Sequence, residues 1–204
     1  MSTKIKICGL TRAQDIQTAN ALQLDYIGFV FTPKSKRFVP PEQAKQLRRQ
    51  LAPGIQTVGV FVNAPPEQIA ALLADGTIGI AQLHGQEDAA YIARLRSLTH
   101  TLIWQAFRIE STEDISRANA SPADLVLLDH GAGGTGERFD WALLHGMARP
   151  FVLAGGLTPQ NAAEAIAKAR PYAVDASSGC ETNGVKDPSK MLAFVNAVRN
   201  TITD

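Results

Sequence analysis

The sequence predicts an α/β fold, a (β/α)8 TIM barrel made by a single domain over residues 1–204. Short apolar segments recur along the chain and end near residues 8, 31, 62, 84, 107, 129, 155 and 177. Most steps between these ends measure 22 or 23 residues and the longest measures 31, which suits one strand, one helix and two short loops. Strands that alternate with helices indicate a parallel sheet. Units of such similar length favour closure into a barrel over a doubly wound open sheet.

Each expected strand is marked by a short apolar or alternating segment. The first alternates and ends at Cys8, whereas the others are almost continuously apolar, as strands covered on both faces are. We expect strands at residues 4–8, 25–31, 57–62, 78–83, 101–107, 125–129, 151–154 and 172–175.

The expected helices are marked by capping residues, by proline at the first helical position and by apolar spacing. Thr11 and Gln14 form a capping-box pair before the first of them. We expect helices at 12–22, after Pro40-Pro41, after Pro65-Pro66, around Tyr91 to Leu95, at 111–118, from Asp140, after Thr158-Pro159 and after Asp187-Pro188. The last is expected to carry one apolar stripe of Met191, Leu192, Val195 and Val198.

Composition and charge exclude several classes of protein. The formal net charge is +1 with no block of like charges, which argues against nucleic acid or a membrane surface as the partner. No apolar run approaches the roughly 18 residues that span a bilayer, and the start lacks a signal-peptide pattern. The two cysteines, Cys8 and Cys180, match neither a zinc site nor a disulfide framework. We therefore expect a cytoplasmic protein.

Polar residues collect at the expected carboxyl ends of the strands. In a barrel these ends meet at one mouth, where such folds carry their active sites. Each residue alone has an ordinary explanation: a free cysteine is usually a small core residue, and an arginine is usually a surface charge. Their shared location favours a functional site. The residues concerned are Cys8, His84, Asp129, Ser177, the Gly155-Gly156 pair and Arg37 in the loop after the second strand.

Two loops late in the chain are typical of a phosphate site. Gly155-Gly156 follows the seventh strand, and Ser177-Ser178-Gly179 follows the eighth. In barrels these loops often present backbone N–H groups to a phosphate, and glycine allows the anion a close approach. Neither loop contains a lysine or an arginine. We therefore expect backbone amides to bind the anion.

The segment Gly131 to Gly136 matches the dinucleotide pattern G-x-G-x-x-G. That pattern requires an acidic residue at a strand end about 20 residues later, where this chain has only Ala154-Gly155-Gly156. We interpret the segment as a loop or lid over the mouth of the barrel.

Taken together, these motifs resemble the phosphoribosylanthranilate isomerase family of tryptophan biosynthesis, over essentially the whole chain. The resemblance rests on their order and combination. The motifs are Lys6-Ile7-Cys8-Gly9, Gly28-Phe29-Val30-Phe31, Pro33-Lys34-Ser35-Lys36-Arg37, Val58 to Asn63, Gln82-Leu83-His84-Gly85, Leu127-Leu128-Asp129, Gly134-Thr135-Gly136, Phe139-Asp140-Trp141, Ala154-Gly155-Gly156-Leu157 and Val174 to Gly179.

The resemblance implies an Amadori rearrangement of N-(5-phosphoribosyl)anthranilate to 1-(2-carboxyphenylamino)-1-deoxyribulose 5-phosphate, without a cofactor or a metal. It implies Cys8 as the general base and Asp129 as the general acid. This pair suits a reaction that protonates the ring oxygen to form an imine and then removes a proton from the carbon next to the imine carbon. It also implies that Arg37 pairs with the anthranilate carboxylate. Gln82, His84 and Asp175 would line the pocket, and Gly155, Gly156, Ser178 and Gly179 would bind the phosphate.

The proposed roles require Cys8 as a thiolate and Asp129 in its protonated form, so the site must shift their pKa values toward each other. With ordinary pKa values of about 8.5 for Cys and 3.9 for Asp, a thiolate beside a protonated Asp costs roughly 6 kcal/mol. Lys6 shares the strand face of Cys8, so we hypothesise that it lies inside the barrel and favours the thiolate. Alternatively, Lys6 neutralises a buried carboxylate such as Asp175, and both roles are compatible.

Two other functions remain open from the sequence. An isomerase of histidine biosynthesis performs the same rearrangement, but that enzyme typically uses two aspartates and two phosphate sites. Here the first strand ends in Cys8, and the first half of the chain has no counterpart of Gly155-Gly156. A non-catalytic phosphate-binding barrel is the other possibility, although it would not need both Cys8 and Asp129. The sequence leaves any oligomeric partner open.

Overall fold

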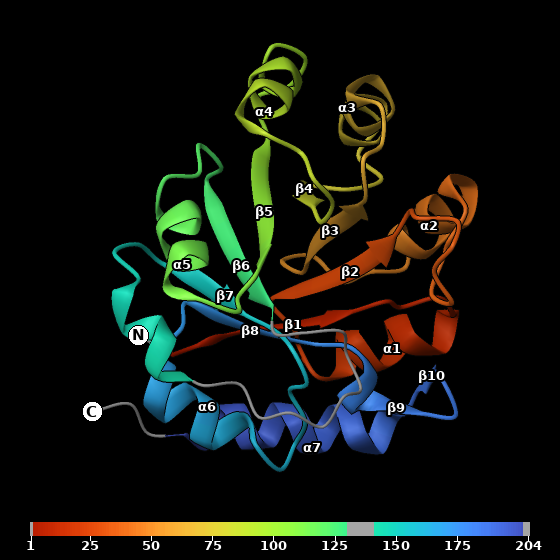
Figure 1. Cartoon of the computed structure of the whole chain (residues 1–204). Helices are drawn as coiled ribbons and strands as arrows, with labels where there is room; N and C mark the ends of the chain where they lie inside the picture. The colour runs from red at the N-terminus through yellow and green to blue at the C-terminus, as the bar shows by residue number, and fades with distance from the viewer. Residues whose placement is uncertain (1, 130–140, 202–204) are drawn as a thin grey trace.

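The barrel predicted from the sequence is closed and entirely parallel. Figure 1 shows the computed structural model, which describes residues 2–129 and 141–201. Its strands follow one another around the barrel in chain order, and β1 pairs with β8 to close it. The open-sheet alternative is therefore wrong. The strands are β1 (Lys4–Cys8), β2 (Tyr26–Val30), β3 (Gln56–Phe61), β4 (Ile80–Leu83), β5 (Leu102–Arg108), β6 (Leu125–Asp129), β7 (Phe151–Leu153) and β8 (Ala173–Ala176).

Helices surround the barrel on its outside (Figure 1). Prolines at the first positions of α2, α3 and α7 confirm the helix starts expected there. The short helix expected from Asp140 is a 3-10 helix, η1 (Trp141–Gly146). The α-helices are α1 (Ala13–Ala21), α2 (Pro41–Arg48), α3 (Pro66–Ala74), α4 (Ala89–Arg96), α5 (Thr112–Asn119), α6 (Ala162–Ala169) and α7 (Pro188–Arg199).

Helix α1 is capped differently from the sequence prediction. The carboxylate of Asp15 accepts hydrogen bonds from the backbone N–H groups of Thr11 and Arg12, at 2.9 and 3.0 Å. The helix begins one residue later than expected, which moves the capping position from Gln14 to Asp15. The expected Thr11–Gln14 capping box is therefore wrong.

Two further helix details differ from expectation. Helix α6 begins at Ala162, after a turn in which the N–H of Thr158 donates to Asn161 Oδ1 at 2.8 Å. On α7, Leu192 is 47% exposed, whereas Phe194 is buried. The helical period of 3.6 residues places Phe194 beside the buried Met191 and Val195, and turns Leu192 toward solvent.

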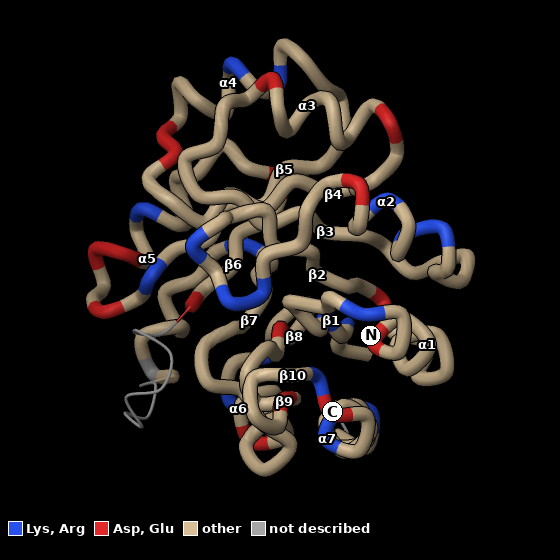
Figure 2. Tube along the Cα trace, turned by 90° about the vertical axis from the view of Figure 1, so that its right-hand side faces the viewer, with Lys and Arg blue, Asp and Glu red and all other residues tan. Residues whose placement is uncertain are grey.

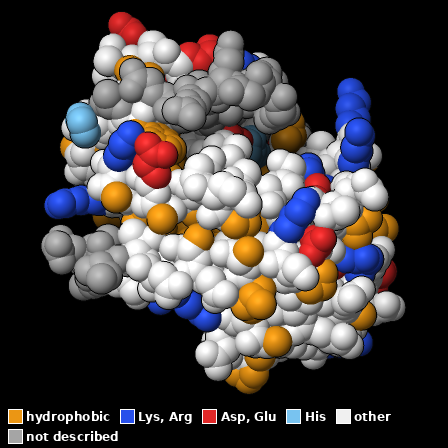
Figure 3. All heavy atoms as spheres, turned by 90° about the horizontal axis from the view of Figure 1, so that it is seen from below, with side chains coloured by type: hydrophobic (Ala, Val, Ile, Leu, Met, Phe, Trp, Pro, Cys, Tyr) orange, Lys and Arg blue, Asp and Glu red, His pale blue; other side chains and the backbone are white. Residues whose placement is uncertain are grey.

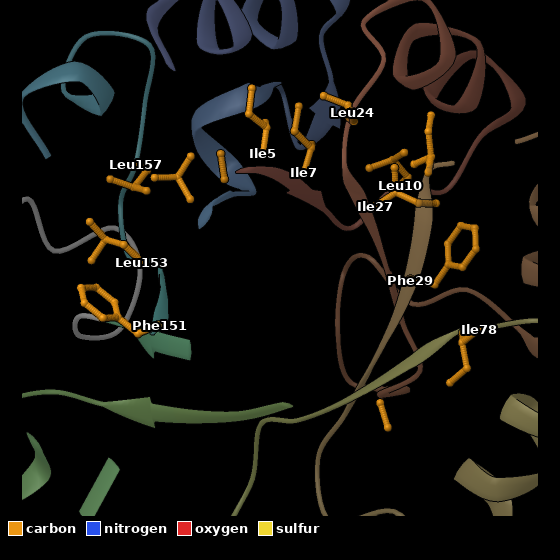
Figure 4. Packing of buried hydrophobic residues seen from close by; sticks show 14 of the residues in the cluster. Ile5, Ile7, Leu10, Leu24, Ile27, Phe29, Ile78, Phe151, Leu153 and Leu157 are labelled. Atoms are coloured by element: carbon orange, nitrogen blue, oxygen red, sulfur yellow. The ribbon is translucent and has the colours of Figure 1, made fainter. Parts of the chain in front are cut away.

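Apolar side chains form two cores, one on each side of the barrel wall. Ile5 and Ile7 of β1 point toward the surrounding helices, as do Ile27 and Phe29 of β2 (Figure 4). Side chains of the opposite parity pack inside the barrel. They are Val58, Ile80, Trp104, Leu127, Val152, Ala154 and Ala173. The strand alternation thus places Lys6 and Cys8 on the inner side, because their parity is opposite to that of Ile5 and Ile7.

A small hairpin that the sequence analysis did not predict lies between β8 and α7. It consists of β9 (Glu181–Thr182) and β10 (Val185–Lys186), and follows a short 3-10 helix, η2 (Ser178–Cys180). Its turn residues Asn183 and Gly184 have φ values of 53° and 77°. Positive φ at both central residues is the geometry of a two-residue hairpin turn, for which Asn-Gly is the preferred sequence.

Charges of both signs are distributed around the outside of the barrel (Figure 2), in keeping with the formal net charge of +1. The face in Figure 3 carries apolar side chains in small areas between polar and charged groups. Among the described residues, none of the helices has the length and apolar character needed to cross a bilayer.

Candidate active site

A cavity of about 490 Å³ opens at the carboxyl ends of the barrel strands. Along individual strands, the residue two positions after an inner-core residue faces this cavity, as with Ile80 and Gln82 or Leu127 and Asp129. The cavity therefore lies directly above the inner core. It brings together every site residue indicated by the sequence except Gly179, namely Cys8, Arg37, Gln82, His84, Asp129, Gly155, Gly156, Asp175, Ser177 and Ser178.

Cys8 lies beside a buried ion pair. Lys6 and Asp175 are register partners on β1 and β8, and Lys6 Nζ lies 2.8 Å from Asp175 Oδ2. Burial opposes the charge on Lys6, but Asp175 and Cys8 outweigh it and raise the Lys6 pKa. Burial also raises the pKa of the Cys8 thiol, which Lys6 counteracts only in part. Lys6 thus pairs with Asp175 and also favours the Cys8 thiolate, although the net direction of the Cys8 pKa is upward.

A polar chain across the cavity reaches Asp129. Gln82 Nε2 lies 3.1 Å from His84 Nδ1, and His84 Nε2 lies 3.5 Å from Asp129 Oδ2. When the Gln82 amide donates to Nδ1, the neutral imidazole carries its proton on Nε2, facing the carboxylate. Cys8 at the end of β1 and Asp129 at the end of β6 line the same cavity, so an acid and a base can act on one bound molecule.

Three cavity residues hold polar atoms without a partner among the described residues. These atoms are Thr32 Oγ1, Gln82 Oε1 and Asp175 Oδ1. Buried polar atoms in native proteins are almost always hydrogen-bonded, because an unpaired one costs free energy. The oxygens of Gln82 and Asp175 are therefore available to accept hydrogen bonds from hydroxyl or amine groups of a ligand.

Arg37 reaches the cavity from the loop after β2 and is held by Glu181. Arg37 Nε donates to Glu181 Oε1 at 2.7 Å, and Arg37 Nη2 donates to Glu181 Oε2 at 2.8 Å. Lys186 also pairs with Glu181. Burial opposes ionisation of Glu181, but the hydrogen bonds and charges of Arg37 and Lys186 outweigh it and lower the Glu181 pKa. Sequence reasoning missed Glu181 and Lys186, and the Asn183-Gly184 turn was the signal that could have drawn attention to them.

The glycine loops differ in what they present to the cavity. Gly155 and Gly156 have φ values of 86° and 64°, a conformation that favours glycine. A Cβ atom on Gly156 would meet nothing within 4 Å, so this backbone borders open space. Gly179 is outside the cavity lining and lies against the backbone of Leu157, where a Cβ atom would collide with the Leu157 carbonyl oxygen. Its lack of a side chain allows the two loops to pack against each other.

Some expectations concern parts of the chain that the structure leaves undescribed. The segment Gly131 to Gly136 lies outside the described residues, so its interpretation as a loop or lid remains a prediction.

Among the described residues, no three or more His, Cys, Asp or Glu side chains are grouped so that they could hold a metal ion.

Comparison with known proteins identifies the family. Residues 5–197 match the family model described as N-(5'-phosphoribosyl)anthranilate (PRA) isomerase. The protein named N-(5'-phosphoribosyl)anthranilate isomerase from Caldanaerobacter subterraneus subsp. tengcongensis is 44% identical over 205 residues, covering 98% of this chain and 99% of that protein. A protein of the same name from Pseudomonas fluorescens is 44% identical, covering 97% and 99%.

Solved structures agree with this assignment. The crystal structure of phosphoribosyl anthranilate isomerase from Thermotoga maritima superposes with a TM-score of 0.89 at 35% identity, covering 97% of this chain and 98% of that chain. The chain therefore belongs to the N-(5'-phosphoribosyl)anthranilate isomerase family.

Proposed function

We propose that Cys8 is the general base and Asp129 the general acid in the isomerisation of N-(5'-phosphoribosyl)anthranilate, the activity of this family. The observation that carries this assignment is the position of the two side chains. They come from β1 and β6 and line one cavity, together with the Arg37 cation and the Gly155-Gly156 backbone. A thiol and a carboxyl group on one bound sugar provide the two proton transfers that the reaction needs.

The reaction divides between the two groups. Asp129 donates a proton to the ring oxygen of the ribose as the bond between that oxygen and the anomeric carbon breaks, which leaves an open-chain iminium. Cys8 as thiolate then removes the proton from the carbon next to the iminium carbon. The resulting enolamine takes up a proton at the former anomeric carbon and releases the proton of its neighbouring enol hydroxyl, which gives the aminoketone product with no net gain or loss of protons. Every step is a proton transfer coupled to bond rearrangement within one substrate, so no external oxidant or reductant is required.

The cavity offers a separate place for each end of the substrate. Arg37 suits the anthranilate carboxylate, because a guanidinium binds a carboxylate with charge-assisted hydrogen bonds. The backbone of Gly155, Gly156 and Ser178 suits the phosphate, since these residues line the cavity and carry no side-chain charge. Gly179 packs against the backbone of Leu157, next to Gly155 and Gly156 in the chain.

A solved relative supports this class of ligand. A phosphoribosyl anthranilate isomerase structure, which superposes with a TM-score of 0.86 at 35% identity, holds reduced 1-(o-carboxyphenylamino)-1-deoxyribulose 5-phosphate. We infer that the present cavity takes the same kind of molecule, a phosphosugar joined to an aromatic carboxylate. A cytoplasmic location belongs to the same proposal, and the two unpaired cysteines are typical of a reducing compartment.

The test is a fluorescence assay for the loss of phosphoribosylanthranilate, applied to wild type, Cys8→Ser and Asp129→Asn. Wild type should turn over the substrate, and each variant should lose about 10²–10⁴-fold in kcat, because a hydroxyl is too weak a base and an amide is no acid. Circular dichroism checks that each variant is folded. A Cys8→Ser protein with more than about a tenth of wild-type activity would exclude Cys8 as the base. A wild-type protein that binds phosphate without turnover would instead be a non-catalytic barrel.

A further inference from the structure

We propose that Glu181 is a positioning residue, which orients Arg37 so that one edge of its guanidinium receives a single carboxylate group of the substrate. The inference rests on the proposed function, since it takes Arg37 as the contact for the anthranilate carboxylate. It adds a residue that acts through Arg37 and explains how the site distinguishes the carboxylate end of the substrate from the phosphate end.

The contact with Glu181 uses one defined edge of Arg37. Nε and Nη2 donate to the two carboxylate oxygens at 2.7 and 2.8 Å, which is the side edge of the guanidinium. A guanidinium has five N–H donors in a fixed plane. The hydrogen bonds of the described residues leave both N–H groups of Nη1 and the second N–H of Nη2 unused. The end edge is thus free to bind a second carboxylate in the same bidentate way, and Arg37 lines the cavity.

The aliphatic part of Arg37 is held as well. Gly9 has a φ of +81°, and a Cβ atom there would collide with Cδ of Arg37. The side chain of Arg37 therefore packs closely over the Gly9 backbone, while Glu181 fixes its charged end. Arginine has high rotamer entropy, and holding it before the ligand arrives lowers the free-energy cost of binding.

Glu181 lies on the β9–β10 hairpin, which is held in place by hydrogen bonds from neighbouring parts of the chain. Arg12 Nη2 donates to the carbonyl oxygen of Lys186 at 2.7 Å, and Lys190 Nζ donates to the carbonyl oxygen of Glu181 at 2.6 Å. These contacts connect β9 and β10 to the start of α1 and to α7. The Glu181 side chain is only 6% exposed. A carboxylate fixed in this way can dictate the orientation of a partly exposed arginine.

The combined charge of Arg37, Lys186 and Glu181 matches that of one carboxylate. Lys186 Nζ, with its side chain 1% exposed, pairs with Glu181 and lies 3.2 and 3.5 Å from the carbonyl and hydroxyl oxygens of Ser177. Its three N–H donors are thereby used, so Lys186 neutralises Glu181 but does not reach the ligand. Two cations and one anion leave a net charge of +1, presented through Arg37 alone. A single carboxylate balances that charge, whereas a phosphate dianion exceeds it.

The experiment compares Glu181→Gln with Glu67→Gln, a matched control. Glu67 also pairs with an arginine, Arg94, but lies on the outer surface with its side chain 59% exposed and outside the cavity lining. Loss of the oriented charge-assisted contact should raise KM for phosphoribosylanthranilate about tenfold or more in Glu181→Gln, with kcat reduced by less than about threefold. Glu181→Asp keeps the charge and should recover part of the affinity. Glu67→Gln should behave as wild type.

The binding of anthranilate and of inorganic phosphate distinguishes loss of the Arg37 orientation from general damage to the site. In calorimetric titrations, Glu181→Gln should bind anthranilate about tenfold more weakly while its affinity for inorganic phosphate stays at the wild-type value. If both affinities fall together, or if neither falls, Glu181 does not act through Arg37 and the inference is wrong. Should Glu181→Gln fail to fold, the Glu181→Gln/Lys186→Met variant removes the buried counter-charge as well, and the same selective loss of anthranilate binding is expected.

Arg37→Met separates failure of this inference from failure of the proposed function. A rise in KM in Arg37→Met, without one in Glu181→Gln, would overturn the positioning role of Glu181 and leave the proposed function intact. An unchanged KM in Arg37→Met would instead refute the contact between Arg37 and the anthranilate. When both single variants raise KM, the double variant Arg37→Met/Glu181→Gln should be no worse than Arg37→Met, because Glu181 then has no arginine to orient.

Discussion

Lys6 and Asp175 face each other across the seam where β1 meets β8, with Lys6 Nζ 2.8 Å from Asp175 Oδ2. Their side chains are 0% and 8% exposed, so the pair lies in the interior of the barrel. Removing one partner of such a pair leaves an uncompensated buried charge and costs about 3–5 kcal/mol. The pair also leaves Asp175 Oδ1 unpaired among the described residues, at the wall of the cavity. A single ion pair thus connects closure of the barrel with the electrostatics around Cys8.

The first prediction concerns Lys6→Met. Lys6 lowers the pKa of the Cys8 thiol against the effect of burial, so its removal should raise that pKa further. The pH midpoint of alkylation by iodoacetamide should move upward accordingly. Cys180 interferes little, because it is buried and its pKa is raised to about 12.

Lys4→Met is the control, since Lys4 pairs with Asp25 and does not line the cavity. If Lys6→Met does not fold, the Lys6→Met/Asp175→Asn variant removes both charges. The midpoint should still rise there, because Lys6 influences Cys8 more than Asp175 does. An unmoved midpoint would show that Lys6 does not assist the thiolate.

The sequence was sufficient to predict the barrel and to predict that the named site residues, apart from Gly179, lie at its mouth. Strand spacing and parity alone determine which residues end the strands on the inner side, and Cys8, Gln82, Asp129 and Asp175 all follow that rule. The chemistry then follows from which polar residues occupy those positions. The strand positions and the side chains that face the inside of the barrel depend on local periodicity, which is visible in a single sequence.

The remaining features depend on contacts that local patterns do not encode. Glu181 meets Arg37 across 144 positions of sequence, and its hairpin strands are two residues each, too short to show alternation. A helix that starts at Arg12 predicts a capping contact at Gln14, whereas the actual start at Ala13 places that contact at Asp15. The resemblance implies the anthranilate carboxylate as a partner of Arg37, but the pairing of Arg37 with Glu181 is visible only in the fold.

The second prediction concerns acid stability. The Glu181 pKa is lowered in the folded state, so its ionised form stabilises the fold at pH values above its unfolded pKa of about 4.3. That contribution should be lost as the pH falls through the folded pKa. In urea unfolding, Glu181→Gln should be less stable than wild type at pH 7, and the difference should shrink below about pH 4. A difference that stays constant across this range would show that Glu181 adds no pH-dependent stability.

The third prediction concerns Arg37→Met. Its contact with the anthranilate carboxylate exists in both the bound substrate and the transition state, so KM should rise more than kcat falls. A charge-assisted contact suggests a rise in KM of about tenfold to a hundredfold. Steady-state kinetics of wild type, Arg37→Met and the surface variant Arg94→Met measure this. A collapsed kcat with an unchanged KM would assign Arg37 to the chemical step instead.

The fourth prediction concerns the phosphate and Gly156→Val. Gly156 has a φ of +64°, and a Cβ atom there would meet no protein atom within 4 Å, so a side chain would project into the open space of the loop. Valine should displace an anion bound by the backbone and strain the turn by about 1–2 kcal/mol. We expect calorimetry to show at least about tenfold weaker binding of inorganic phosphate, and kcat should fall too, because phosphate binding positions the sugar.

Gly76→Val distinguishes loss of the anion site from backbone strain. Gly76 has a φ of +75° and also has nothing within 4 Å of an added Cβ atom, but it lies outside the cavity lining. Both variants should therefore lose similar stability, while only Gly156→Val should lose phosphate affinity. Because a Cβ atom on Gly156 would meet nothing within 4 Å, and so would not touch Cys8, the thiol reactivity of Cys8 should be the same in both variants. Equal phosphate affinity in the two folded variants would place the anion elsewhere, and the phosphate end of the proposed substrate orientation would then be wrong.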